Sequence, residues 1–288
     1  MERARTGSAV GGHDGMSDLS SGKDHSQENF PVASWLVKSQ HRAPIMIFYR
    51  FARAADDIAD HPAASEAEKL ARLAEMRAGL TGEGSAEAMA LAEVARANGL
   101  ELIHAQELLD AFVQDVTQRR YESWEALIAY CRLSAMPVGR FVLDVHGEDR
   151  SLWPLSDALC AALQVINHLQ DCAKDFRAID RVYIPTANLK AAGIGVDALA
   201  APRASAELRG VIVGLAEQTK LLLERSKPFA AHIRDARLSA EVAVIQRLAE
   251  DLTGLLLTRD PLSEKVHHSK PRAAWLAMGA VLRNWVRA

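Results

Sequence analysis

Apolar residues recur at three- and four-residue spacings along almost the whole chain, and this limits the fold more than any other feature. One such run consists of Leu102, Ile103, Leu109, Phe112, Val113 and Val116. The spacing is that of one face of an α-helix. Ala, Leu, Glu, Arg and Gln, which favour helix, dominate the sequence, and no convincing run alternates as a strand would. The pattern predicts an all-α chain of roughly eight to ten helices.

Turn residues mark where these helices end. Breaks are predicted at residues 61–65, 81–85, 98–99, 146–151 and 191–195. Ser65 is placed to cap the helix that follows it. Asp260 followed by Pro261 predicts another helix start, with Pro at the first helical position. No linker separates the helices, so a single domain is expected over residues 25–288.

The first 24 residues differ from the rest. They are rich in Gly, Ser and Asp and lack an apolar period, which predicts a disordered tail and no secretory signal. No stretch reaches the roughly 18 apolar residues of a membrane span. The apolar segment "WLAMGAVL" (275–282) is interpreted as a helix that faces the core rather than a membrane surface.

Charge and cysteine content restrict the class of protein further. The formal net charge is -3, which argues against a nucleic-acid partner. The three cysteines, Cys131, Cys160 and Cys172, form no C-x-x-C pair, and an odd number cannot all pair within the chain. A reducing cytoplasm is the expected location.

Two acidic stripes on predicted helices are the features most suggestive of function. In "RAADDIAD" (53–60), Asp56 and Asp60 are four residues apart and share one helix face. In "LQVINHLQDCAKDF" (163–176), Asn167, Asp171 and Asp175 repeat the four-residue spacing. Like charges at this spacing repel by roughly 0.2–0.5 kcal/mol per pair. Both stripes therefore indicate that a cation lies between them.

Mg²⁺ is the natural candidate, because it is hard, prefers oxygen ligands and binds through one or two carboxylates together with phosphate and water. Two facing stripes predict a cluster of two or three Mg²⁺ ions that would hold a diphosphate and stabilise it as a leaving group. Cationic and hydroxyl side chains suited to the same task are Tyr49, Arg53, Arg181, Tyr183, Lys270 and Arg272.

Two other classes of protein remain open on the residues alone. Glu101 with His104, and Glu264 with His267, form two Glu-x-x-His motifs, the spacing found in di-iron carboxylate bundles. The motifs lack a clear second pair of Glu residues on apolar helix faces. A non-catalytic helical scaffold is the third class, and it needs no acidic stripe.

Three longer segments resemble the squalene/phytoene synthase family, and the resemblance extends over roughly residues 25–285. They are "FYRFARAADDIAD" (48–60), "YCRLSAMPVGR" (130–140) and "NHLQDCAKDFRAIDRVYIP" (167–185). The segments "ENFPVAS" (28–34), "YCRLSAMPVGR" and "HHSKPRA" (267–273) are most similar to the hydroxysqualene synthase branch of bacterial hopanoid pathways.

The resemblance implies an all-α isoprenoid-synthase fold around a central cavity. It implies that Asp56 and Asp60 form one Mg²⁺ motif and Asn167, Asp171 and Asp175 the other. Positions that match contacts to the diphosphate or the prenyl chain are Asn29, Phe30, Tyr49, Arg53, Tyr130, Ser134, Ala135, Gly139, Gln164, Arg181 and Tyr183. Ala135 and Gly139 are small enough to leave room for a C30 chain.

The implied reaction converts presqualene diphosphate and water to hydroxysqualene and diphosphate. Some relatives carry Arg before the first Asp of the second motif, where this chain has Gln170. One positive group fewer favours a single diphosphate. Condensation of two farnesyl diphosphates to presqualene diphosphate or squalene is the alternative. No G-x-G-x-x-G follows a strand, so no NADPH is expected. Transient contact with a partner synthase or oxidoreductase, and peripheral contact with the inner membrane face, stay open.

Overall fold

The computed structural model describes the backbone of residues 37–287 and the side chains of residues 37–284, and in this part of the chain it is helical. The predicted tail, residues 1–24, lies outside the described residues. The helices are α1 (Ser39–Asp60), α2 (Glu66–Gly79), α3 (Ala86–Asn98), α4 (Ile103–Thr117), α5 (Trp124–Ser134), α6 (Met136–Val145), α7 (Trp153–Ile179), α8 (Thr186–Ala191), α9 (Ala206–Ser226), α10 (Phe229–His232), α11 (Ala236–Thr258) and α12 (Lys270–Arg287), with 3-10 turns η2 (Arg150–Leu152) and η3 (Val196–Ala200). Between residues 37 and 287 the β-pairing is limited to one bridge, Arg120 to Val182.

The predicted turn residues end and start helices as expected. Ser65 forms a capping box with Glu68 at the start of α2, which satisfies two amides that the helix leaves open. Gly99 adopts a left-handed conformation, φ 65°, at the end of α3. A residue without Cβ has no steric penalty there.

The predicted helix start at Asp260 is wrong. The Asp260 carboxylate accepts hydrogen bonds from Leu262 N at 3.0 Å, Ser263 Oγ at 2.7 Å and Ala204 N at 3.0 Å. It therefore closes a local turn and fastens the segment before α9. No helix follows until α12 begins at Lys270. Asp caps turns as readily as helices, so the dipeptide alone did not distinguish the two.

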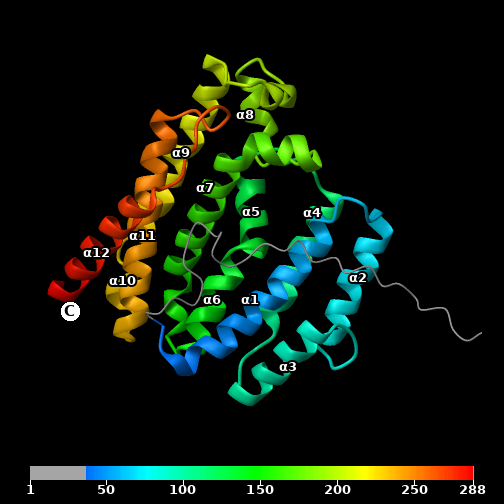
Figure 1. The fold of residues 1–288 in the computed structure, drawn as a ribbon, viewed down its shortest axis with the longest axis vertical. Helices are drawn as coiled ribbons and strands as arrows, with labels where there is room; N and C mark the ends of the chain where they lie inside the picture. Colours follow the sequence, from blue (N-terminus) through cyan, green and yellow to red (C-terminus); the bar gives the residue numbers. More distant parts are fainter. Residues whose placement is uncertain (1–36, 288) are drawn as a thin grey trace, which may run out of the picture.

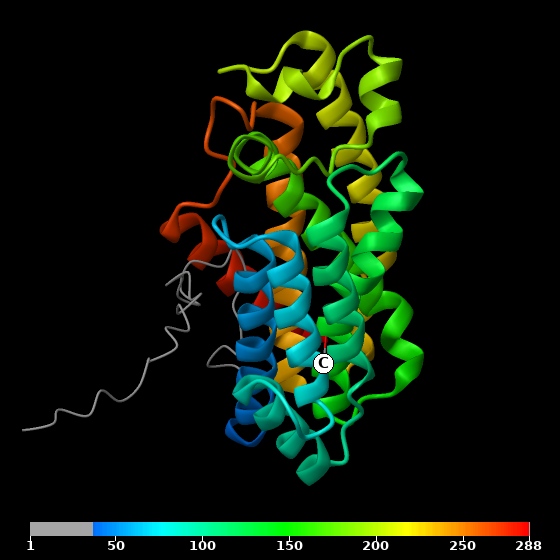
Figure 2. The same ribbon diagram turned by 90° about the vertical axis from the view of Figure 1, so that its right-hand side faces the viewer.

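The long helix α7 lies in the middle of the bundle (Figure 1). Helices α1 to α4 lie on one side of it, and α9, α11 and α12 on the other. Helix α7 packs against α5, α6, α9 and α11, whereas α1 packs against α2, α3, α4 and α6. Turning the molecule shows most long helices running roughly along its long axis (Figure 2). This arrangement brings the carboxyl ends of α1 and α7 to one region.

Two large apolar clusters follow this division. The larger one forms around α5, α7, α9 and α11, and the smaller one around α1 to α4. Phe141 of α6 joins the smaller cluster and stacks on Phe48 with ring centroids 4.0 Å apart. Helix α6 therefore connects the first four helices to the rest of the bundle.

The segment Trp124–Val145 is long and apolar enough to cross a membrane by composition. It is two helices, because the backbone breaks at Ala135 between α5 and α6. Both helices pack against α4 and α7. The composition of this segment is that of core helices.

Helix α12 only partly confirms the interpretation of its apolar segment. Leu276 and Ala280 pack against Val244 and Leu248 of α11, as expected for a core-facing helix. Trp275, Met278 and Leu282 are exposed, Trp275 by 66%. The helix is therefore apolar on both its packed and its exposed sides.

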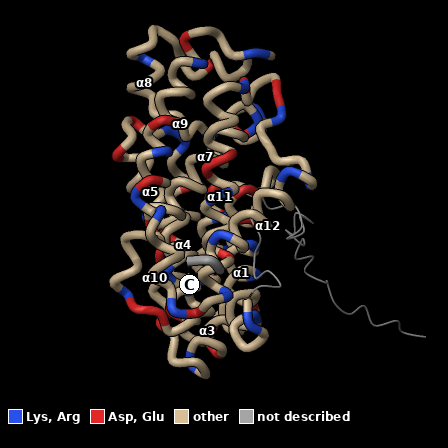
Figure 3. The backbone as a smooth tube through the Cα atoms, turned by 90° about the vertical axis from the view of Figure 1, so that its left-hand side faces the viewer, with Lys and Arg blue, Asp and Glu red and all other residues tan. Residues whose placement is uncertain are grey.

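Charges are spread widely over the chain. Figure 3 shows Lys and Arg interspersed with Asp and Glu along the face that it presents. Cys131, Cys160 and Cys172 are all free thiols.

Candidate functional site

The two predicted acidic stripes lie on α1 and α7 and meet near the carboxyl ends of these helices. Asp56 and Asp60 lie on the last two turns of α1, and Asn167, Asp171 and Asp175 on the second half of α7. Arg181, just after α7, donates to Asp60 Oδ1 from Nη1 at 2.9 Å. This ion pair joins residues 121 positions apart and fixes the two helix ends against each other.

The pKa of Asp175 shows that negative charges gather where the two stripes meet. Burial raises the pKa of its carboxyl to about 7, and the negative charges of Asp171 and Asp60 add to the shift. Lys174 opposes it and lies 3.2 Å from Asp171 Oδ2. A cation placed beside this carboxyl would stabilise its ionised form. The donor set, carboxylates with an amide, is the one that Mg²⁺ prefers.

The stripes do not form a closed metal cage by themselves. Within the described residues, no three of their carboxylates come within 4.8 Å of one another. Mg²⁺ commonly completes its shell with substrate phosphate and water. The spacing therefore fits ions that bind together with a phosphorylated ligand.

Arg53 lies on the same face of α1 as Asp56 and Asp60. Its guanidinium pairs with Asp56 and, at 2.9 Å, with Asp57. Tyr49 lies one turn earlier on that face and is half-buried. Helical spacing thus places the predicted Tyr49 and Arg53 in one row with the acidic pair.

A buried polar network lies directly behind the Asp60–Arg181 pair, and Asp115 of α4 is at its centre. Asp115 is 7% exposed. Its carboxylate accepts from Tyr130 Oη at 2.8 Å and from Tyr183 Oη at 3.1 Å. Arg181 donates to the Asp115 carbonyl at 3.0 Å, with Nε 3.7 Å from the carboxylate. Three predicted residues, Tyr130, Arg181 and Tyr183, are therefore brought together by one that was not predicted.

Pairing within the network offsets the cost of burying the charges of Asp115 and Arg181. Burial raises the pKa of the Asp115 carboxyl to about 6, and the Arg181 charge and the Tyr130 hydrogen bond pull it back. Burial also opposes the charge of Arg181, but Asp115 and Asp60 raise its pKa. Buried charges persist only when they are paired in this way. Arg181 therefore depends on both carboxylates.

His168 closes the network on the α7 side. Its ring stacks on Tyr183 with centroids 3.5 Å apart. Burial lowers the pKa of the imidazole to about 3, with the Arg181 charge adding to the effect. His168 is thus neutral and contributes a flat, uncharged surface next to the two tyrosines.

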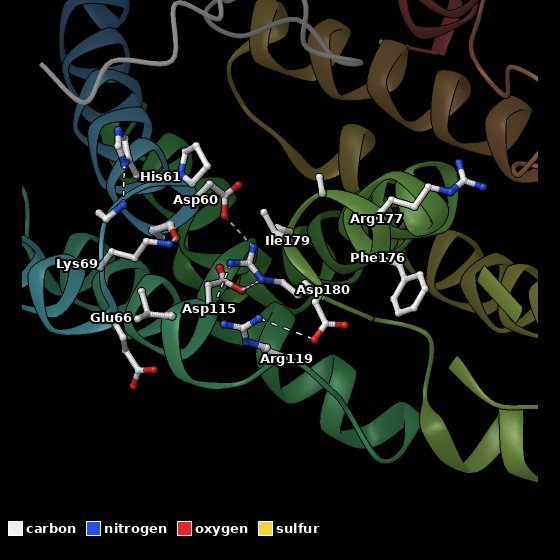
Figure 4. Close-up of a pocket in the computed structure, with 16 residues that line it drawn as sticks. Asp60, His61, Glu66, Lys69, Asp115, Arg119, Phe176, Arg177, Ile179 and Asp180 are labelled. Carbon is white, nitrogen blue, oxygen red and sulfur yellow. Dashed lines mark hydrogen bonds and ion pairs between the residues drawn. The ribbon is translucent and has the colours of Figure 1, made fainter. Parts of the chain in front are cut away.

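A cleft of about 410 Å³ opens beside Asp60, Asp115 and Arg181. Figure 4 shows Asp60, Lys69 and Asp115 reaching it from three different helices, with Arg119 near Asp180 at its edge. Lys69 Nζ donates to the Ala59 carbonyl at 2.9 Å, and burial lowers its pKa. Four cationic side chains line the cleft, namely Lys69, Arg119, Arg177 and Arg181. Four acidic side chains, Asp60, Glu66, Asp115 and Asp180, line it as well, so the cleft is strongly polar and its charges are balanced.

Lys270 and Arg272 are not brought to the acidic stripes by any described contact. Lys270 is exposed at the start of α12, and Arg272 forms a bidentate pair with Asp251 of α11 at 2.7 and 2.8 Å. His267 is the nearer residue of this segment. Burial lowers its pKa, and the Asp171 charge works against that shift.

Gln170 has a structural partner at the position where some relatives carry Arg. It is buried, and its side-chain amide donates to the Val266 carbonyl. The residue thereby ties α7 to the loop before α12. This loop is what brings His267 toward Asp171.

The remaining predicted residues lie on α5, α6 and α7. Gln164 shares the α7 stripe with Asn167. Ser134 Oγ is buried and has no hydrogen-bond partner among the described residues, and Ala135 forms the break between α5 and α6. Asn29 and Phe30 lie outside the described residues.

Gly139 of α6 lies close against α7. A Cβ at this position would meet Ser156 Oγ and would lie 2.6 Å from Cys160 Sγ. The small residue was predicted to make room for substrate. The structure gives a different reason for it, which is the close approach of α6 to α7.

The two Glu-x-x-His motifs do not converge. Glu101 pairs with Arg150 at 3.1 Å, His104 with Asp144 at 3.1 Å, and Glu264 accepts from Asp260 N. Among the described residues, the one grouping of three potential ligands within 4.8 Å belongs to other side chains. The geometry gives no support to a di-iron bundle.

Asp115 and Lys69 were missed by sequence reasoning. Asp115 falls on the same helical face as Leu108 and Ala111, which are both buried. A charged residue in an apolar stripe was the available signal, because buried carboxylates occur only where they are paired. Lys69 offers no such signal, since lysine on a helix is ordinary.

Comparison with known proteins identifies the family of the chain. The sequence profile described as squalene/phytoene synthase matches residues 23–272. The chain is 54% identical to the hydroxysqualene synthase of Zymomonas mobilis over 266 residues, covering 91% of this chain and 90% of the relative. It is 49% identical to that of Rhodopseudomonas palustris, with 94% of each covered.

Solved structures show the same fold. The squalene synthase of Alicyclobacillus acidocaldarius superposes with a TM-score of 0.71 at 31% identity, covering 83% of this chain and 90% of that one. A dehydrosqualene synthase gives a TM-score of 0.75 at 18% identity over 90% and 92%, which is evidence for the fold alone. The chain belongs to the squalene/phytoene synthase family.

Proposed function

We propose that this enzyme converts presqualene diphosphate and water to hydroxysqualene and diphosphate. The observation that carries the proposal is the meeting of two acidic stripes beside the Arg181 network. The choice of substrate is supported by the 46–54% identity of the chain to three hydroxysqualene synthases. The proposed substrate is therefore a C30 prenyl diphosphate.

Asp56, Asp60, Asn167, Asp171 and Asp175 are the proposed Mg²⁺ ligands. Their oxygen donors and the raised pKa of Asp175 fit a hard dication. Bound Mg²⁺ would supply positive charge to the diphosphate leaving group. The chain's own residues would orient that group, with Arg53 and Tyr49 on the α1 side. Arg181 would hold Asp60 in place from the α7 side.

The C–O bond of the substrate breaks with its electron pair leaving on the diphosphate. The resulting cyclopropylcarbinyl cation rearranges, and a water oxygen attacks it to form the C–OH bond. The water proton passes to the released diphosphate or to solvent. No electrons are exchanged with a cofactor, so no NADPH is required.

The buried tyrosines would provide a wall beside the cation. Tyr130 and Tyr183 have their hydroxyls committed to Asp115, and burial raises both pKa values well above the ordinary range. They stay neutral and cannot themselves capture the cation as phenolates. Ser134 Oγ, which is buried and unpaired among the described residues, is the proposed polar contact for substrate on α5.

Product analysis tests this proposal. The purified chain with Mg²⁺ and without NADPH is incubated separately with presqualene diphosphate and farnesyl diphosphate. We expect a C30 alcohol from presqualene diphosphate, and its loss in Asp171→Asn. The exposed Glu217→Gln, on α9, is the matched control and should keep full activity. Presqualene diphosphate formed from farnesyl diphosphate would instead assign the chain to the condensing reaction.

The proposed setting is the cytoplasm, on the ground of its three free thiols. The exposed Trp275, Met278 and Leu282 of α12 would provide contact with the inner membrane face. An enzyme with this substrate would take it from a partner synthase, because a C30 diphosphate is poorly soluble as a monomer. Co-sedimentation with vesicles, compared between the wild type and Trp275→Ser, tests the membrane contact.

A further inference from the structure

His41, His146 and Asp235 meet at the end of the bundle opposite the acidic stripes. They come from the first turn of α1, the residue that follows α6 and the residue that precedes α11. These three chain segments lie together at the lower end of the molecule in Figure 1. One ligand atom from each lies within 4.8 Å of the other two. His41 is 19 residues before Asp60, which is roughly 28 Å along a helix.

His146 is oriented as metal-binding histidines are. Its Nδ1 donates to the Val142 carbonyl at 2.8 Å. The lone pair is then on Nε2, and Nε2 is buried without a hydrogen-bond partner among the described residues. A ring held through one nitrogen by a backbone carbonyl, with the other nitrogen available, is the usual arrangement at metal sites.

Asp235 is fixed on one side by the backbone and paired on the other with a partly exposed lysine. Its Oδ1 caps α11 by accepting from Arg237 N at 2.9 Å and Leu238 N at 3.2 Å. Its own backbone amide is held by Glu148 at 2.8 Å. The second oxygen, Oδ2, contacts Lys38 Nζ at 2.7 Å. The side chain of Lys38 is 48% exposed, so its ammonium can move into solvent.

His41 completes the group from the start of α1. Its ring lies against that of His146, with centroids 4.2 Å apart and planes inclined by 36°. The two imidazoles lie near the Asp235 carboxylate, and the cation now paired with Oδ2 is the partly exposed Lys38. The arrangement has the donor atoms of a His₂Asp site with a removable cation in it.

We propose that His41, His146 and Asp235 bind one transition-metal dication of the Zn²⁺ type, with water as the fourth ligand. Ligands of tetrahedral zinc lie about 3.3 Å apart, so binding requires side-chain shifts of about 1 Å and departure of Lys38. Two nitrogen donors favour zinc over magnesium. The site would tie the start of α1 to α6 and α11, and it is independent of the proposed reaction.

Zinc binding to the metal-free full-length protein tests this proposal. We expect one tight equivalent of Zn²⁺ in a chelator competition, and at least a 100-fold weaker affinity in His146→Gln and in Asp235→Asn. Asparagine retains the helix cap, so the second variant should still fold. His232→Gln is the matched control, because His232 is an exposed histidine whose Nδ1 bonds to the Pro228 carbonyl. Saturating zinc should raise the melting temperature of the wild type by roughly 5 °C.

Lys38→Met sharpens the test. Removing the competing ammonium should tighten zinc binding several-fold if the metal takes Asp235 Oδ2. Co²⁺ substitution should give the visible bands of a four-coordinate site in the wild type but not in His41→Gln. Equal zinc affinity in the wild type and His146→Gln would overturn the proposal. So would an equivalent that disappears in His13→Gln/His25→Gln but survives in His146→Gln.

Discussion

The guanidinium of Arg181 lies 2.9 Å from the carboxylate of Asp60 and also binds the backbone carbonyl of Asp115. One side chain thereby connects the last turn of α1, the end of α4 and the segment after α7. Asp60 of the first stripe is therefore held against the buried network around Asp115. The geometry of the site and the stability of the bundle are coupled through this contact.

Arg181→Gln should destabilise the fold strongly. Removing one partner of a buried pair leaves the other charge uncompensated, and the expected loss is about 3–5 kcal/mol. Adding Asp115→Asn should recover part of this loss, because the uncompensated charge is then absent. Urea unfolding of both single variants and the double variant measures the coupling. Strictly additive losses would mean that the two side chains act independently.

Asp175→Asn should separate stability from activity. The pKa of Asp175, about 7 in the fold, exceeds the unfolded value of about 3.9. The carboxyl therefore favours the folded state at low pH, and this contribution is lost as pH rises from about 4 through 7. The metal-free variant should be more stable than the wild type at pH 8 and should vary less with pH.

The same variant should lose at least roughly 100-fold in activity, because several kcal/mol of charge stabilisation would be removed. Melting curves with and without Mg²⁺, from pH 5 to 8, check both halves of the prediction. Glu217→Gln, at an exposed position on α9, provides the control. A metal-free variant less stable than the wild type at pH 8 would contradict the electrostatic interpretation.

Gly139→Ala should cost about 1–3 kcal/mol through overpacking of α6 against α7. The added methyl would meet Ser156 Oγ and Cys160 Sγ. Combining it with Ser156→Ala and Cys160→Ala removes both contacts and should restore most of the melting temperature. Activity that stays low in the restored variant would show that Gly139 also contacts substrate.

Asp251→Asn should loosen α12. Hydrogen bonds from Arg272 lower the pKa of Asp251, with His268 contributing in the same direction against burial. Its stabilisation is therefore present above about pH 4 and lost as pH falls through the lowered pKa. At pH 7 the variant should lose about 1–3 kcal/mol. Hydrogen exchange of the α12 amides should accelerate, and a rate equal to that of the wild type would exclude this anchoring role.

Local patterns in the sequence predicted the helices and most of their ends well. Ser65 and Gly99 work because caps depend on neighbouring residues only. Asp260 misled because an Asp can cap a turn as well as a helix, and its contact with Ala204, 56 residues away, is not visible in the local sequence. The acidic stripes were visible through helical spacing. Asp115, which organises Tyr130 and Tyr183, was not recognised, because its partners come from α5 and the segment after α7.

Gly139 illustrates a different limit. A small residue on a helix is equally consistent with a ligand cavity and with close helix packing. The position of Ser156 and Cys160 on α7 shows the close packing, and contact of Gly139 with substrate stays a prediction. Long-range packing is not encoded in the periodicity of a single segment.

The most direct test of the central claim is the fate of presqualene diphosphate in ¹⁸O-labelled water. The purified chain and Mg²⁺, without NADPH, are given this substrate, and the C30 product is analysed by mass spectrometry. The account predicts a rearranged C30 alcohol whose oxygen carries the label, because water captures the cation. An unrearranged alcohol with unlabelled oxygen would show cleavage at phosphorus instead, and would contradict the account.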